Sequence, residues 1–213
     1  MRFLDDYKSQ PNIGLRKINQ FVNKNVCINE KMGLPSSTKR LDDFCQKIGK
    51  VNLKKLNKFN KRYNLQCFSK IDIIICSKIS LSGGHSFLIQ DIVSSSKNNF
   101  IILITGIGGK TDIRSIKLHF KELQNIQIYK SINGNFLSKL NWIQQEIIKI
   151  NPSNVWLLNA HEDSVAVGSV QPNQNYKVRF IHHADDKLCL GSSIKYFIHY
   201  DTNPNCFYHC RKV

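Results

Sequence analysis

The hydrophobic pattern of the first 70 residues is helical. From 11 to 25, apolar residues recur at near-helical spacing, which predicts an amphipathic helix. Pro35-Ser-Ser-Thr38 reads as a break that carries helix-starting residues, and the apolar positions from Leu41 to Ile48 predict a second helix. Those from Val51 to Tyr63, interleaved with lysines, predict a third.

From residue 71 onward, short β-branched runs alternate with helix-length patterns. Ile71–Cys76 and Phe100–Thr105 are nearly continuous apolar runs, as expected of strands that are covered on both faces. A weaker run covers 126–129, and further runs begin at Val155, Tyr176 and Ile194. Helix-length patterns lie between them, at 87–93, 112–123 and 136–150. This alternation predicts an α/β fold with a doubly wound, mostly parallel, Rossmann-like sheet. We place a basic helical N-terminal extension at 1–70 and the α/β domain at 71–213.

Each of the last three apolar runs leads into polar residues that can do chemistry. These are His161-Glu-Asp163, His182-His-Ala-Asp-Asp186 and His199-Tyr-Asp201. The carboxyl ends of parallel strands meet at one edge of a sheet, which is where open α/β sheets bind ligands. We therefore expect these side chains to converge on one crevice.

Glycines follow the first two strands of the α/β segment. At Gly83-Gly84-His85 they would let a ligand approach the backbone, with helix amides attracting a phosphate or carboxylate and His85 donating to a ligand oxygen. A plain tight turn is the alternative. Gly106–Thr111 is interpreted as a turn, because the position where a P-loop needs its first glycine is Ile104.

Carboxylates and imidazoles in the last third offer two kinds of chemistry. Asp163 suits a base or a partner for a sugar hydroxyl, and equally an ordinary helix N-cap. His182, His183, Asp185 and Asp186 form the densest cluster, which could bind a divalent metal or hold ligand hydroxyls. Adjacent residues on an extended segment point opposite ways, so His182 and His183 face one small site only if the strand has ended.

Composition limits the class of protein. The chain has 213 residues, enough to bury a core, and no apolar stretch near membrane-span length. The charged N-terminus does not resemble a signal peptide. Seven cysteines, an odd number without a Cys-x-x-Cys pair, favour free thiols in a reducing compartment. We expect a cytoplasmic protein.

The formal charge of +16 is concentrated in the first 70 residues. Such an excess attracts phosphate-bearing partners, although a compositional bias towards lysine explains it equally well. The lysine-rich helix at 51–63 either contacts an anionic membrane peripherally or packs on the main domain, and packing is the default expectation. No nucleic-acid module accompanies the charge, so no specific nucleic-acid partner is expected.

Several of these stretches together resemble the N-terminal half of bacterial glycosyltransferases with the two-domain GT-B architecture. They are Ser82-Gly-Gly-His85, Phe180-Ile-His-His-Ala-Asp185 with Leu188-Cys-Leu-Gly191, and His199-x-Asp201 before Cys210-Arg211. The resemblance covers about residues 70–213. It implies a Rossmann-like domain that holds a sugar or lipid-linked acceptor, while a second domain holds the nucleotide-sugar, commonly without a metal. No cofactor or metal is therefore expected.

The resemblance also implies roles for single residues. Gly84 and His85, with Gly83, would line the cleft, and His182, His183 and Asp185 would orient the acceptor or approach the transferred sugar. We add four residues as substrate contacts, namely His161, Asp163, His199 and Asp201.

Two departures from the pattern matter. Asp186 stands where a histidine is expected, and the chain stops at Val213, before any donor-binding half. The expectation is an acceptor-binding domain of a truncated transferase, which uses a nucleotide-sugar only if a second domain is supplied.

Two alternatives stay open. One is a metal-dependent hydrolase, phosphoesterase-like, with His161, Asp163 and the His182–Asp186 cluster as ligands. The other is a non-catalytic sugar or phosphate binder.

Overall fold

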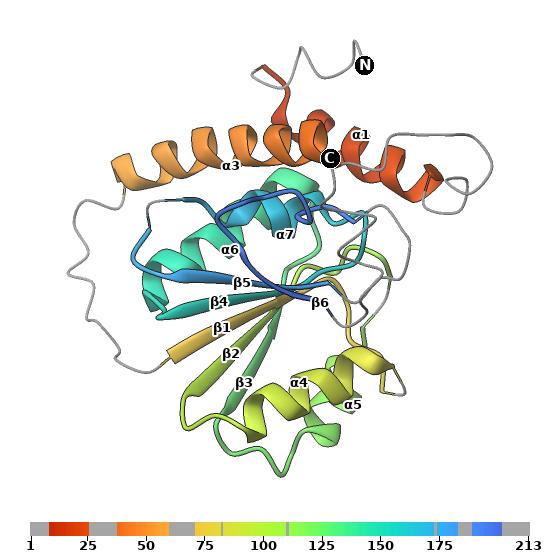
Figure 1. Ribbon diagram of the computed structural model, residues 1–213, viewed down its shortest axis with the longest axis vertical. Helices are drawn as coiled ribbons and strands as arrows, with labels where there is room; N and C mark the ends of the chain where they lie inside the picture. The colour runs from red at the N-terminus through yellow and green to blue at the C-terminus, as the bar shows by residue number, and fades with distance from the viewer. Residues whose placement is uncertain are drawn as a thin grey trace.

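A sheet of six parallel strands forms the middle of the molecule (Figure 1). The computed structural model describes residues 9–25, 38–59, 71–81, 83–109, 111–172, 174–182 and 189–201. The strands are β1 (Ile71–Cys76), β2 (Asn99–Ile104), β3 (Ile126–Lys130), β4 (Asn154–Leu158), β5 (Lys177–His182) and β6 (Ile198–Asp201). Their order is β3-β2-β1-β4-β5-β6, and every neighbouring pair is parallel. The predicted doubly wound, Rossmann-like fold is confirmed.

Helices lie on both faces of the sheet. They are α1 (Pro11–Asn25), α3 (Lys39–Phe59), α4 (Gly84–Ser94), α5 (Ile113–His119), α6 (Phe136–Ile150) and α7 (Ser164–Ser169). In Figure 1, α4 and α5 lie below the strands, α6 and α7 lie above them, and α1 and α3 form a further layer above α6 and α7.

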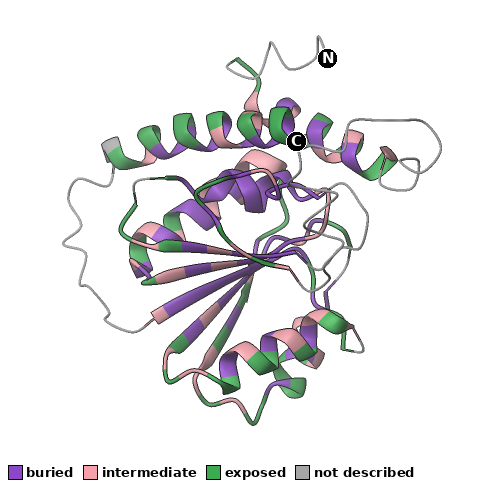
Figure 2. Ribbon diagram, viewed as in Figure 1, coloured by how far each residue is buried: buried purple, intermediate pink, exposed green. Residues whose placement is uncertain are grey.

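The side chains of the central strands alternate between two buried clusters. On β1, Ile73 and Ile75 face the cluster shared with α6 and α7, whereas Ile74 and Cys76 face the one shared with α4. Both faces are therefore apolar, which explains why the run reads as continuous rather than alternating. Figure 2 shows the buried positions along the strands and on the inward sides of the helices.

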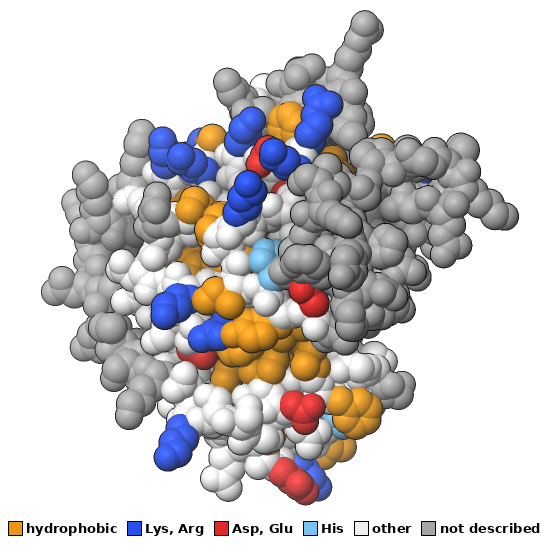
Figure 3. All heavy atoms as spheres, viewed as in Figure 1, with side chains coloured by type: hydrophobic (Ala, Val, Ile, Leu, Met, Phe, Trp, Pro, Cys, Tyr) orange, Lys and Arg blue, Asp and Glu red, His pale blue; other side chains and the backbone are white. Residues whose placement is uncertain are grey.

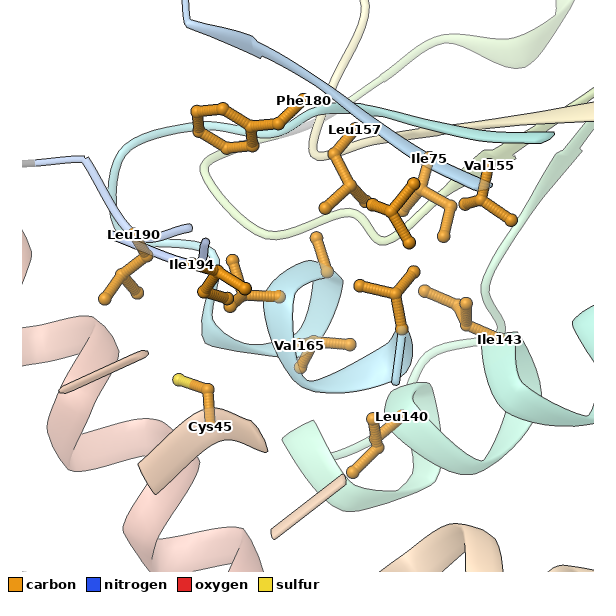
Figure 4. Close-up of a cluster of buried hydrophobic side chains, with 14 of the residues drawn as sticks. Cys45, Ile75, Leu140, Ile143, Val155, Leu157, Val165, Phe180, Leu190 and Ile194 are labelled. Atoms are coloured by element: carbon orange, nitrogen blue, oxygen red, sulfur yellow. The ribbon is translucent and has the colours of Figure 1, made fainter. Parts of the chain in front are cut away.

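Helix α7 is the centre of the larger cluster. All six of its residues are buried. Figure 4 shows Val165 between sheet side chains such as Leu157 and the side chains of Cys45 on α3 and Leu140 on α6. Leu15 and Ile18 of α1 belong to the same cluster. The N-terminal helices thus share a core with the α/β part of the chain. The division at residue 70 into two domains remains a prediction.

Helix α3 joins the segments that the sequence predicts as separate second and third helices, so that prediction is wrong within 39–59. Gly49, at the predicted junction, stays helical because it packs against α7. A Cβ built on Gly49 would lie 1.8 Å from the carbonyl oxygen of Gly168. Only a residue without a side chain allows these two backbones to approach so closely.

The outward side of α3 carries its positive charge. Lys47, Lys50, Lys54 and Lys55 are exposed, while Leu41, Cys45 and Ile48 are buried. Figure 3 shows Lys and Arg side chains gathered over this part of the surface. Within 39–59 the helix therefore packs these apolar residues on the main domain and leaves its lysines exposed. Contact of the lysines with an anionic membrane stays a prediction. Within the described ranges, no helix has the length and apolar character that crossing a bilayer requires.

The last strand begins later than the sequence pattern indicates. The apolar run Ile194–Ile198 predicts a strand, but 194–197 form a turn in which the Phe197 amide donates to the Ile194 carbonyl at 3.2 Å. Phe197 is buried against Phe180, with ring centroids 5.9 Å apart. The apolar character of this run thus serves packing, and β6 starts at Ile198.

Candidate functional site

The strand order reverses between β1 and β4, because β2 and β3 lie on one side of β1 whereas β4, β5 and β6 lie on the other. Open α/β sheets bind ligands at the carboxyl ends of the two strands where this reversal occurs. Hydrogen bonds tie the two loops there together. The Ser77 hydroxyl, directly after β1, accepts from the Ala160 amide at 2.7 Å and donates to Asp163 at 2.6 Å. These hydrogen bonds join the loops that follow β1 and β4.

Asp163 is the centre of this network. One carboxylate oxygen accepts from the amides of Val165 and Ala166, and the other accepts from the hydroxyls of Ser77 and Thr105 at 2.6 Å each. The side chain is fully buried, and burial is the main cause that raises its pKa. The structure shows the N-cap of α7, one of the two roles that the sequence allows for Asp163. In this position it holds the loops of the rim together.

An open hollow of about 650 Å³ lies beside this network, over the start of α4. Its lining combines polar and apolar side chains, namely Lys78, Ser80, Gly83, Gly84, His85, Phe87, Leu88 and Asp91. A Cβ on Gly84 would meet no atom within 4 Å, so this glycine borders open space. The predicted Gly83-Gly84-His85 turn therefore lines a cavity.

His85 is half-buried, whereas Lys78 and Asp91, the other titratable residues of the lining, are exposed. Its ring is hydrogen-bonded to the backbone of Lys78. Burial, with a smaller contribution from the positive charge of Lys78, lowers its pKa below the ordinary value of 6.5. The imidazole is therefore neutral at neutral pH, the form that accepts a proton.

A second group of histidines lies at the end of β5 and β6. His182 and Asp201 are register partners on the two strands, and His182 Nδ1 lies 3.7 Å from Asp201 Oδ1. His182 is 1% exposed, whereas the Asp201 side chain is 18% exposed. His199 Nε2 lies 2.9 Å from the Ile194 carbonyl oxygen and its ring contacts Phe180. His182 and Asp201 thus lie at the carboxyl edge of the sheet, where the loop that carries His85 also begins, and the Asp201 side chain is the more exposed of the two.

The remaining predicted residues divide into described and undescribed ones. His161 is half-buried in the loop after β4, where its carbonyl accepts from the Leu190 amide at 2.9 Å. His183, Asp185 and Asp186 lie outside the described residues. Among the described residues, no group of three His, Cys, Asp or Glu side chains is placed to hold a metal ion. The metal-ligand hypothesis therefore gains no support from the described part of the chain.

Lysines that the sequence does not single out also reach this edge. Lys78 lines the hollow, Lys130 ends β3, and Lys139 lies in the second turn of α6. Lys139 Nζ donates to the Thr105 carbonyl oxygen at 2.8 Å, next to the Asp163 network. The sequence places Lys130 at the end of a predicted strand, which indicates a position at this edge of the sheet. Nothing in the helical pattern distinguishes Lys139 from other lysines.

Comparison with known proteins leaves the fold and the site geometry as the basis for assigning function. No model of a protein family matches the sequence, and no curated protein is similar to it.

Proposed function

We propose that the chain binds the acceptor sugar of a glycosyl transfer in the hollow beside His85, as the acceptor-binding half of a GT-B-type glycosyltransferase. The observation that carries the proposal is a half-buried histidine in the lining of an open hollow at the carboxyl edge of a Rossmann-like sheet. The sequence resemblance of Ser82-Gly-Gly-His85 and of the double-histidine stretch supports the same assignment.

The lining suits a sugar, which has apolar C–H faces and polar hydroxyls. Phe87 and Leu88 offer apolar contact, and Phe87 is 58% exposed. Ser80, Lys78 and Asp91 offer donors and acceptors to hydroxyls. A hollow with an apolar part and a few polar groups is the usual form of a small-ligand site.

The neutral imidazole gives His85 a role in the transfer itself. When the acceptor hydroxyl oxygen attacks the anomeric carbon, a new C–O bond forms and the bond to the nucleoside diphosphate breaks. The hydroxyl proton then passes to the imidazole as general base, and the diphosphate leaves as the anion. A lowered pKa favours the neutral ring, in which one nitrogen carries a proton and the other has a lone pair that can accept the proton of the hydroxyl.

Binding of the purified chain to an array of glycans tests the proposal. We expect a defined subset of glycans to be retained, and we expect His85→Gln to weaken that binding by about tenfold through loss of one hydrogen bond to the ligand. The matched control is His119→Gln, because His119 is an exposed histidine on α5. Failure of the array to retain any glycan, or equal retention by the His85 variant, would refute the assignment.

A transfer assay then separates catalysis from binding alone. The retained glycan is incubated with the chain and radiolabelled nucleotide-sugars. A labelled product that is lost in His85→Gln assigns catalysis to this chain. Binding of the glycan without product limits the chain to holding the acceptor.

A further inference from the structure

Two lysines from different elements reach the same turn at the carboxyl end of β2. Gly106 has a positive φ of 68°. A Cβ placed on Gly106 would lie 3.3 Å from Lys139 Nζ and 3.6 Å from Lys130 Cε. The absence of a side chain on Gly106 therefore lets both lysine side chains approach the backbone of this turn. Ser131 Oγ would lie 3.9 Å from the same Cβ.

Protein carbonyls occupy only part of the hydrogen-bonding capacity of these ammonium groups. Lys139 Nζ donates to the Thr105 carbonyl oxygen at 2.8 Å, and Lys130 Nζ donates to the Thr111 carbonyl oxygen at 3.1 Å. An ammonium group has three N–H donors, so these contacts leave donors on both groups for a ligand. Both side chains are half-buried and held in place rather than extended into water.

Protein carboxylates balance the local charge only in part. Among the described residues, neither lysine forms an ion pair with a carboxylate. The negative charge of Asp163 acts on Lys139, but its two oxygens already accept four hydrogen bonds from other donors. Burial, and to a smaller extent the charge of Lys130, lower the pKa of Lys139 despite the attraction of Asp163. The two neighbouring ammonium groups repel each other, and an anion bound near both would offset that repulsion.

We propose that Lys130 and Lys139 form an anion-binding site, with Gly106 and Ser131 as its other walls, for the phosphate or carboxylate group of a ligand. Lysine suits phosphate as a point charge, and the Ser131 hydroxyl adds a polar contact to an oxygen. The site stands apart from the lining of the sugar hollow and does not depend on the proposed function.

Calorimetric titration of the whole chain with inorganic phosphate, pyrophosphate and acetate tests the site. We expect saturable binding of at least one of these anions, and the comparison between them shows whether phosphate or carboxylate is preferred. Lys139→Gln and Lys130→Gln should each weaken that binding by about tenfold or more. Binding should also raise the pKa of Lys139, followed by NMR of lysine side chains labelled with ¹³C at Cε, because an anion stabilises the charged ammonium.

The matched control is Lys149→Gln on the same helix. Its side chain is 76% exposed and paired with Glu146, and its removal changes the net charge by the same amount. This variant should bind the anions as the unaltered chain does. Equal weakening by Lys149→Gln would show attraction by net charge alone and would overturn the site. Absence of saturable binding to all three anions, or unchanged binding in Lys130→Gln, would overturn it as well. His85→Gln should leave anion binding intact, so failure of the sugar proposal is distinguishable from failure of this one.

Discussion

Replacement of Asp163 by alanine should destabilise the chain strongly, because this one carboxylate satisfies donors from three segments. The variant removes the N-cap of α7, which costs about 1 kcal/mol. It also takes the acceptor from the buried hydroxyls of Ser77 and Thr105, at a cost of about 1 kcal/mol or more each. We expect the free energy of unfolding to fall by about 3 to 5 kcal/mol, a large part of the stability of an ordinary domain.

The asparagine variant sharpens this prediction. Asp163→Asn keeps one oxygen that can accept from the Val165 and Ala166 amides. Its amide nitrogen replaces the oxygen that faces the hydroxyls of Ser77 and Thr105. These hydroxyls can rotate and accept hydrogen bonds from the amide group. Because burial raises the pKa of Asp163, the neutral amide also avoids the cost of a buried charge. We expect a loss of about 1 to 2 kcal/mol, clearly smaller than in the alanine variant.

Urea denaturation followed by tryptophan fluorescence measures both losses. The control is Asp112→Ala, since Asp112 caps α5 in the same way but is exposed to solvent. Its removal should cost less than that of Asp163. The reasoning is wrong if Asp163→Ala loses less than about 1 kcal/mol, or if the asparagine variant is the less stable of the two.

Two further predictions concern α3. Gly49→Ala should lower the free energy of unfolding by about 1 to 3 kcal/mol in the same urea assay, because the new methyl group meets the Gly168 carbonyl. An unchanged free energy of unfolding would contradict the close packing of α3 and α7. Asp42 is buried and accepts from the Gly191 and Ser193 amides, and burial raises its pKa to about 6. A raised pKa means that the folded state binds the Asp42 proton more tightly than the unfolded state does. The stability of the unaltered chain, measured relative to that of Asp42→Asn, should therefore fall by about 3 kcal/mol as the pH rises from 4 through 6. Stability profiles of the two proteins that run parallel over this pH range would contradict the raised pKa.

The sequence predicts elements well where local signals agree. Helix α6 has the predicted bounds, because the apolar periodicity of Phe136–Ile150 coincides with an Asn135 N-cap and an Asn151 in the left-handed region at its end. The strands β1 and β4 follow directly from their apolar runs. Local pattern fails where tertiary packing decides. Gly49 continues a helix because α7 needs the close approach, and Ile194–Phe197 is apolar because it covers Phe180 in a turn.

The candidate site shows the same division. Gly83-Gly84-His85 was predictable as a lining turn, because the loop after the first strand of such a sheet faces the crevice. The placement of Asp163 inside a hydrogen-bond network depends on Ser77 and Thr105, which are 86 and 58 residues away in the sequence. Lys130 and Lys139 come close to each other because β3 and α6 flank the Gly106 turn in the folded chain. The local sequence around either lysine does not predict this arrangement.

The proposal that the hollow beside His85 holds a sugar can be tested by mapping backbone amide shifts by NMR, with a glycan that the chain retains. We expect the shifts to concentrate at Lys78, at 83–85 and at Leu88, and the His85 ring signals to move with them. Shifts confined to other surfaces, such as the exposed Tyr200 on β6, with 78–91 unchanged, would contradict it.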